Sequence, residues 1–178
     1  MFVRYIRWRH SRGYGVHSPF AFHIVQEVLS NPYDFYGFHD IDAVLEKERK
    51  PRHLRRKTRL LLRLANLMRP GAVFLSPKLP TVYGVALLAA VPHARFLSKN
   101  KNAEDADLIV TSDDYATTAF LHSAVSAHGK TIVLINQPRA SVQMLLDDFK
   151  EGLVLYDRHD ILAFPRPDMN RITYPILL

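Results

Sequence analysis

The stretch AVFLSPKLPTVYGVALLAAV, residues 72–91, joins a short apolar run to a longer apolar segment through a turn that contains two prolines. Three more apolar runs of five or six residues follow along the chain: ARFLS (94–98), DLIVTS (107–112) and TIVLIN (131–136). Polar or helix-breaking residues bound each run. This pattern is typical of strands that are buried on both faces of a parallel sheet.

Helical stretches separate these runs, at residues 81–91, 114–129 and 138–152. The last of them starts with Pro138, and Gly152 lies just past its expected end, as is common at helix termini. Strands that alternate with helices predict a doubly wound α/β sheet with right-handed crossovers.

The tail of the chain has a different pattern. The runs GLVLYD (152–157) and DILAFP (160–165) are separated by only two residues, which predicts an antiparallel hairpin. RITYPIL (171–177) is a further strand candidate.

Basic residues are concentrated in the first part of the chain. Residues 1–70 hold 14 Lys and Arg against 6 Asp and Glu, whereas residues 71–178 hold 10 against 11. The formal net charge of +7 therefore belongs to the front of the protein. We expect residues 1–70 to form a helical N-terminal segment packed on the core, and residues 71–178 to form the sheet domain of a single compact unit.

The segment PRHLRRKTRLLLRLANLMRPG, residues 51–71, predicts an amphipathic helix that docks by its leucines. Its arginines share the opposite face, which is either solvated or binds the phosphates of nucleic acid or of an anionic membrane surface. No aromatic residues interleave these arginines, so a base-stacking groove is not indicated. The candidate anion-binding residues are Arg52, Arg56, Arg59 and Arg63.

Several classes of protein are excluded by what the sequence lacks. It contains no cysteine, which excludes disulfides, thiol nucleophiles and Cys-based zinc sites. Its nine histidines lack the spacing of a metal site, and it has neither a P-loop nor a Gly-x-Ser-x-Gly motif. Its longest apolar stretch, from Val82 to Val91, is far shorter than the ~20 residues of a membrane span. The N-terminus has no apolar core of a signal peptide. We therefore expect a cytoplasmic protein without a membrane span or a metal site.

Residues 12–29, RGYGVHSPFAFHIVQEVL, contain the start of a helix. Ser18 is the expected N-cap and Pro19 the first helical residue, and Ile24 belongs to an apolar stripe behind them. We interpret His17 as part of this helix start rather than as a catalytic base, because adjacent side chains rarely face one another as a nucleophile and its base must.

Several of these segments together resemble a known family. VHSPF (16–20) before an amphipathic helix, LLLRLANLMRPGAVFLSP (60–77), DLIVTSDD (107–114), TIVLIN (131–136) and the paired terminal strands are similar, in this order, to a Bacteroidetes-type family of class I S-adenosylmethionine-dependent methyltransferases. The resemblance implies a Rossmann-like fold and a methyl-transfer ancestry. It does not by itself imply activity.

In that family the cofactor lies at the carboxyl ends of the strands, over a turn of pattern E-x-G-x-x-x-G. This pattern falls on FLSPKLP, so that Phe74 takes the acidic position and Ser76 and Pro80 take those of the two glycines. Pro77 and Pro80 also remove two amide donors from the turn. We expect that the turn no longer binds the cofactor in the family's manner.

The other positions at which the resemblance implies acids are also changed. Ser98 or Lys99 stands at the ribose-binding acid, Ser112 precedes Asp113 at the next strand end, and the amides 136–137 replace an acidic pair. We therefore expect no catalytic residue, and cofactor binding and catalysis to be lost. The vestigial site positions are Ser76, Lys78, Pro80, Ser98, Ser112 and Asp113.

The link between two of the expected strands is also short. Only eight residues, 99–106, separate ARFLS from DLIVTS, and one crossover alone needs at least ~10–12. The family's third strand is therefore missing, so 94–98 forms the sheet edge and the order is 2-1-4-5 in the family's numbering, followed by the hairpin. A second subunit or another protein can cover this edge.

Two alternatives to a degenerate enzyme stay open: an active methyltransferase with an atypical site that uses S-adenosylmethionine, and a nucleic-acid or anionic-surface binding module that uses the arginine helix.

Overall fold

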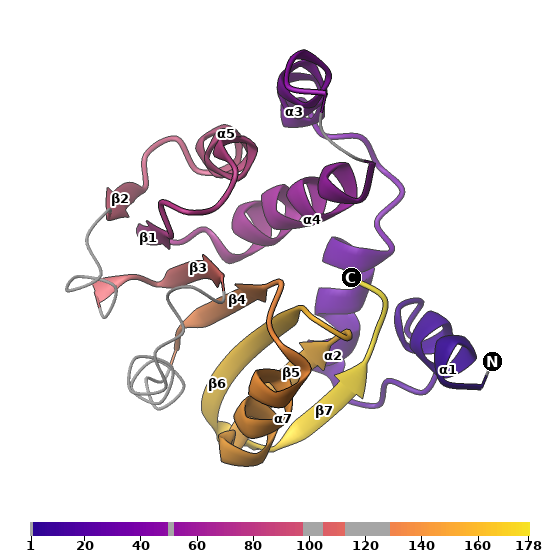
Figure 1. The fold of residues 1–178 in the computed structure, drawn as a ribbon. Helices are drawn as coiled ribbons and strands as arrows, with labels where there is room; N and C mark the ends of the chain where they lie inside the picture. The colour runs from indigo at the N-terminus through magenta and orange to yellow at the C-terminus, as the bar shows by residue number, and fades with distance from the viewer. Residues whose placement is uncertain (1, 50–51, 98–104, 113–128) are drawn as a thin grey trace.

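The computed structural model describes residues 2–49, 52–97, 105–112 and 129–178. Within these ranges seven strands form one sheet in the order β2-β1-β3-β4-β6-β5-β7 (Figure 1). The strands are β1 (Ala72–Leu75), β2 (Arg95–Leu97), β3 (Leu108–Ser112), β4 (Thr131–Ile135), β5 (Glu151–Tyr156), β6 (Ile161–Asn170) and β7 (Ile172–Pro175). The helices are α1 (Phe2–His10), α2 (Pro19–Ile24), the π-helix η1 (Val25–Leu29), α3 (Gly37–Lys47), α4 (Arg52–Met68), α5 (Thr81–Ala90) and α7 (Arg139–Asp148).

The strand directions confirm the predicted architecture. β2, β1, β3 and β4 are parallel to one another, whereas β6 is antiparallel to both β4 and β5. β7 is parallel to β5 and extends the sheet beyond the hairpin. Among the described residues β2 is an edge strand, as expected from the short link that follows it. Most of that link and the helix expected at 114–129 lie outside the described residues.

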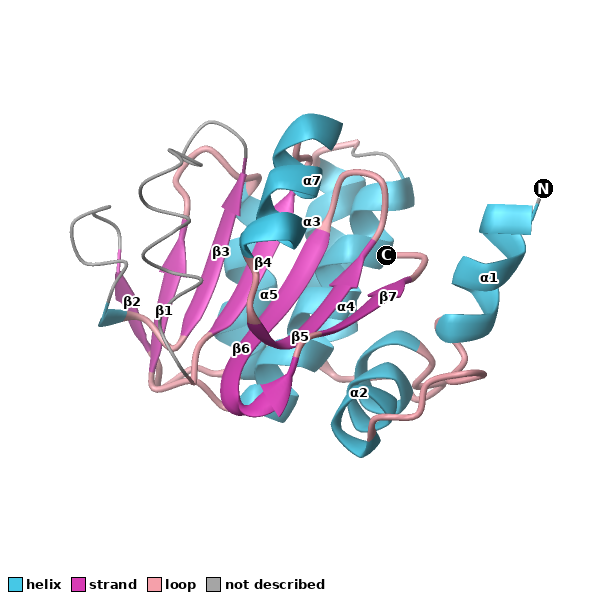
Figure 2. Ribbon diagram, turned by 90° about the horizontal axis from the view of Figure 1, so that it is seen from below, coloured by secondary structure: helices cyan, strands magenta, loops and turns pink. Residues whose placement is uncertain are grey.

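Helices cover both faces of the sheet (Figure 2). Side chains alternate along the strands, so that Val73 joins the core formed with α4 and α5, whereas Phe74 joins the core formed with α7. The leucines of α4 are buried as predicted, including Leu61 and Leu64. This two-sided burial is the reason why the strand runs are almost uniformly apolar.

Two sequence predictions about the strands are wrong. β2 is not buried on both faces, since Arg95 and Phe96 are exposed; an edge strand has a neighbour on one side only and receives less cover. Gly152 does not cap a helix, because α7 ends at Asp148 and Gly152 lies inside β5 with a φ of 107°. A Cβ there would lie 2.2 Å from the carbonyl oxygen of Phe164, so a β-bulge requires glycine at this point.

The N-terminal helices pack against the far end of the sheet. Ser18 caps α2 as predicted, and its Oγ accepts a hydrogen bond from the amide of Ala21 at 3.3 Å. α1 lies beside β7, where the amide of Leu177 donates to the Oγ of Ser11 at 2.8 Å. Within the described part of the chain, no helix has the length and apolar character needed to cross a bilayer.

Candidate functional site

Strands β1, β3, β4 and β5 end at one edge of the sheet, as do the outer strands β2 and β7. β1, β3 and β4 are parallel, and β5 runs in the same direction because both β4 and β5 are antiparallel to β6. The residues at or just after their carboxyl ends are Ser76, Ser112, Asn136 and Asp157. Ligands of open α/β sheets bind outside this edge, which makes it the candidate functional site.

In the turn after β1, backbone amides donate hydrogen bonds to carbonyl groups of the protein itself. The amide of Ser76 donates to the carbonyl of Val110 at 2.9 Å, and the amide of Leu79 donates back to the carbonyl of Ser76 at 3.0 Å. Pro77 and Pro80 have no amide hydrogen. The turn therefore offers a ligand few of the donors that a glycine-rich turn would present.

Side chains of the same turn are arranged for packing. Phe74, at the position of the family's acid, is buried in the core under α7. Leu79 is also buried, and Pro80 is the N-cap of α5 without a side-chain hydrogen bond. Lys78 is exposed. The Oγ of Ser76 is buried and has no hydrogen-bond partner among the described residues.

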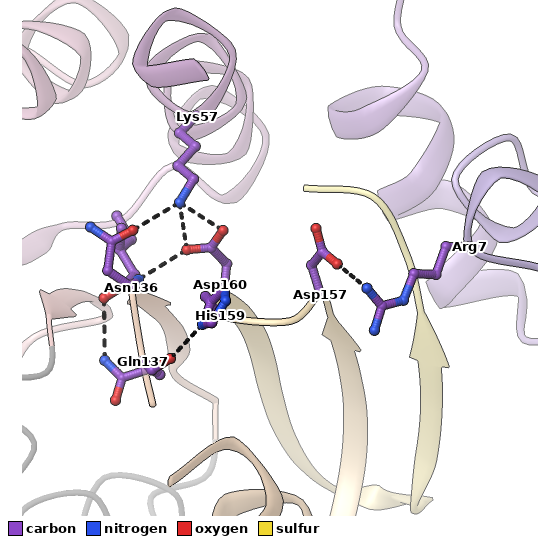
Figure 3. A network of polar contacts seen from close by, with 8 residues as sticks. Arg7, Lys57, Asn136, Gln137, Asp157, His159 and Asp160 are labelled. Atoms are coloured by element: carbon purple, nitrogen blue, oxygen red, sulfur yellow. Dashed lines mark hydrogen bonds and ion pairs between the residues drawn. The ribbon is translucent and has the colours of Figure 1, made fainter. Parts of the chain in front are cut away.

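A polar network occupies the end of β4 (Figure 3). Asn136 has a φ of 57°, and its backbone N–H donates to Oδ1 of Asp160 at 3.0 Å. The Nζ of Lys57 donates to the side-chain oxygen of Asn136 at 3.1 Å and to Oδ1 of Asp160 at 2.8 Å. Asn136 is exposed, and it is hydrogen-bonded to both members of the Lys57–Asp160 ion pair.

The neighbouring Gln137 is tied to the loop that precedes β6. Its amide donates to the carbonyl of His159 at 2.6 Å, and Nδ1 of His159 lies 3.0 Å from the carbonyl of Gln137. The Gln137 side chain is buried, and its Nε2 donates to the carbonyl of Ile135 at 3.3 Å. Its Oε1 has no partner within the described ranges.

Charge at this edge also affects Tyr83 of α5. Burial raises the pKa of the Tyr83 phenol, and the negative charge of Asp160 raises that pKa further. Tyr83 is therefore a neutral phenol at physiological pH and cannot supply a phenolate.

Sequence reasoning missed Lys57 and Asp160 as residues of this edge. The two lie 103 positions apart, and no local pattern connects them. Of the predicted site positions, the structure brings Ser76, Lys78, Pro80 and Ser112 to the edge. Ser98 and Asp113 lie outside the described residues, so their role stays a prediction.

The arginine face of α4 is partly covered by α3. The guanidinium of Arg59 donates to Oδ2 of Asp42 at 2.6 Å and lies 4.6 Å from the ring centroid of Phe38. Arg63 lies 5.1 Å from the same centroid. Burial lowers the pKa of Arg63, and the charge of Arg59 lowers it further. The interpretation of this face as simply solvated is wrong for Arg59 and Arg63, because α3 packs against it.

Arg56 remains at the exposed part of this face. Its guanidinium donates to the carbonyl of Leu177 at 2.9 Å. The side chain of Arg52 is not described. Anion binding by Arg52, Arg56, Arg59 and Arg63 stays a prediction, and for Arg59 it would compete with the existing pair to Asp42.

A shallow cavity of about 320 Å³ lies further along the same edge, between α1 and α7. Arg7 and Asp157, which form an ion pair, line it together with Tyr156 and Gln143. Among the described residues, no group of three or more His, Asp and Glu side chains is placed to hold a metal ion.

The fold is similar to that of a solved methyltransferase. The crystal structure of a methyltransferase from Geobacter sulfurreducens superposes with a TM-score of 0.52, covering 75% of this chain and 92% of that chain at 12% sequence identity. No protein-family model matches the sequence, and no curated protein matches it either. At this identity the likeness shows the fold alone, which is a methyltransferase-like Rossmann fold.

Proposed function

We propose that this methyltransferase-like chain no longer binds S-adenosylmethionine or transfers methyl groups, and that it works as an interaction protein. The observation that carries the proposal is the turn after β1. Two of its positions are prolines, and the amides of Ser76 and Leu79 are bonded within the protein. A cofactor that binds through the backbone of this turn would therefore find these two amides already bonded and would form no hydrogen bonds with them.

The replaced acids support the same proposal. The side-chain oxygen of Asn136 already accepts a hydrogen bond from Lys57, and an amide lacks the negative charge of an acid for the hydroxyl or amino groups of a cofactor. Each missing partner of a buried polar group costs ~1–3 kcal/mol, and every 1.4 kcal/mol is about tenfold in affinity. Two or three such losses weaken binding by orders of magnitude.

Calorimetric titration with S-adenosylmethionine and with S-adenosylhomocysteine tests the proposal. We expect no binding heat at sub-millimolar ligand, while an active methyltransferase titrated in the same buffer serves as the positive control. A micromolar dissociation constant for either compound would refute the loss of cofactor binding.

One observation favours an active methyltransferase with an atypical site as the second candidate. The Oγ of Ser76 and Oε1 of Gln137 are both buried at this edge and have no partner in the described part of the chain. A bound cofactor would satisfy them. Under this candidate the titration gives a micromolar constant, and Ser76→Ala weakens binding relative to the control Lys150→Ala, an exposed position just before the start of β5 and away from this edge.

The surface that we propose for the interaction is the edge of the sheet formed by β2. β2 has three residues, and its Arg95 and Phe96 are exposed. An edge strand presents unpaired backbone groups that another chain can use. A second copy or another protein is therefore the partner that we propose for this edge.

A further inference from the structure

α1 carries an outward face on which arginine and aromatic residues alternate. Tyr5 and Trp8 are 54% and 41% exposed, and their rings stack with centroids 6.0 Å apart. The guanidinium of Arg12 lies 4.7 Å from the centroid of Trp8, and that of Arg9 lies 5.9 Å from the centroid of Tyr5. Arg4 is exposed on the same helix, one turn before Trp8.

The segment that carries this face has charged side chains of one sign only. Residues 1–26 contain four arginines and no carboxylate, since Glu27 is the first acidic residue of the chain. Arg7 is directed toward the body of the protein, where it pairs with Asp157. In the described part of the chain no carboxylate pairs with Arg4, Arg9 or Arg12, so a polyanion can approach all three.

We propose that the outward face of α1 binds single-stranded nucleic acid. Unpaired bases stack on the rings of Tyr5 and Trp8, and the phosphates between them contact Arg4, Arg9 and Arg12. Aromatic side chains combined with basic groups are the means by which proteins hold single strands without sequence preference. This binding is independent of whether the sheet edge binds S-adenosylmethionine.

The distribution of side chains on α1 favours a single strand over a membrane surface. A helix that lies in a bilayer interface needs an apolar face to bury in the lipid. On α1 the exposed apolar side chains are Val3, Tyr5 and Trp8, and the exposed Arg4 and Arg9 lie next to them in sequence, so the outward face is not continuously apolar. Duplex ends are a poorer match as well, because their bases are already stacked within the helix. Figure 2 shows α1 at the margin of the molecule, beyond β7.

The protein carries its own probe, because Trp8 is its only tryptophan. Titration of the full chain with oligothymidylate or oligouridylate of about twelve nucleotides, a length within the usual site sizes, is expected to quench Trp8 emission. The logarithm of the affinity is expected to fall with the logarithm of salt concentration with a slope of about −2, as for three phosphate contacts on a single strand. A duplex of the same length should bind more weakly. Absence of quenching at low salt overturns the proposal.

Substitutions test whether binding takes place on this face, with affinity measured by the fluorescence anisotropy of a labelled single strand. Trp8→Ala is expected to weaken binding roughly tenfold, within the range for loss of one stacked base, whereas Trp8→Phe retains most of the affinity. The double variant Arg9→Gln and Arg12→Gln is expected to weaken binding more than Lys150→Gln with Arg171→Gln. The latter pair removes the same charge from exposed positions elsewhere. Equal losses in the two double variants, or no loss in Trp8→Ala, contradict the proposal.

Vesicles of phosphatidylserine and phosphatidylcholine provide the competing ligand. Insertion into lipid would shift Trp8 emission to shorter wavelength instead of quenching it. Such a shift with vesicles, together with no response to single strands, would overturn the proposal in favour of a membrane surface. Quenching by single strands with no lipid-induced shift supports it.

Discussion

Asp160 joins two elements at the carboxyl edge of the sheet. Its carboxylate accepts hydrogen bonds from Nζ of Lys57 at 2.8 Å and from the amide of Asn136 at 3.0 Å. We expect Asp160→Asn to lower the free energy of unfolding by about 1–3 kcal/mol, because Lys57 loses its charged partner in a largely buried position. Urea unfolding followed by circular dichroism measures the loss.

Lys57→Met is the matched variant for a double-mutant cycle with Asp160→Asn. If the two groups interact directly, the double variant loses less stability than the sum of the two single variants. Strictly additive losses would show that Lys57 and Asp160 stabilise the edge independently.

At the scale of single residues, predictions succeed where the cause is local. Ser18 is recognisable as a helix cap because the amide that it binds belongs to Ala21, three positions away. Glycine is required at position 152 because the carbonyl of Phe164, on another strand, lies too close for a side chain. The residues next to Gly152 in the sequence do not show this contact and suggest a helix end instead. Lys57 and Asp160 meet only in the folded chain, for the same reason.

At the scale of elements, α4 lies between the sheet and α3. Arg59 pairs with Asp42 and stacks on Phe38, whereas Arg56 donates to the carbonyl of Leu177 at the surface. We therefore expect Arg59→Gln to cost about 1–2 kcal/mol, from the ion pair and the ring contact together. Arg56→Gln is the control and is expected to change stability by less than about 0.5 kcal/mol. Thermal unfolding of both variants compares them, and equal melting temperatures would show that the α3 contact contributes nothing.

The elements differ in how well their sequence marks them. The strands β1, β3 and β4 are predictable because burial on both faces requires unbroken apolar runs, and α4 is predictable because its leucines recur with helical period. α3 begins at Gly37 without a side-chain cap, and α2 continues into the π-helix η1 without any distinct pattern. The candidate site is predictable only as a set of strand ends, since its network forms between elements that are distant in sequence.

At the scale of the whole molecule, one core joins the front helices to the sheet. Buried residues from α2, α3 and α4 belong to the same cluster as residues from β1, β3 and β5. We expect the chain to unfold as one unit, so that Trp8 fluorescence on α1 and circular dichroism of the whole chain give the same urea midpoint. The boundary predicted at residues 70 and 71 would then divide the sequence but not the folding unit.

The control for this measurement is a variant that loosens α1 alone. Arg7→Ala removes the ion pair to Asp157 and is expected to separate the two midpoints, with Trp8 reporting the earlier one. Distinct midpoints in the unmodified protein would mean that the helical front unfolds independently of the sheet.

The position of β6 between β4 and β5 constrains the order in which the sheet can form during synthesis. During synthesis β5 leaves the ribosome before β6, yet its place in the sheet is beside β6 and not beside β4. Until residues 161–170 have been made, β4 has one unpaired edge and β5 has no partner to join. Non-local pairing of this kind forms slowly and leaves strand edges open to aggregation. The nascent chain therefore passes through a vulnerable interval that closes only when β6 and β7 have been made, and chaperone demand should concentrate there.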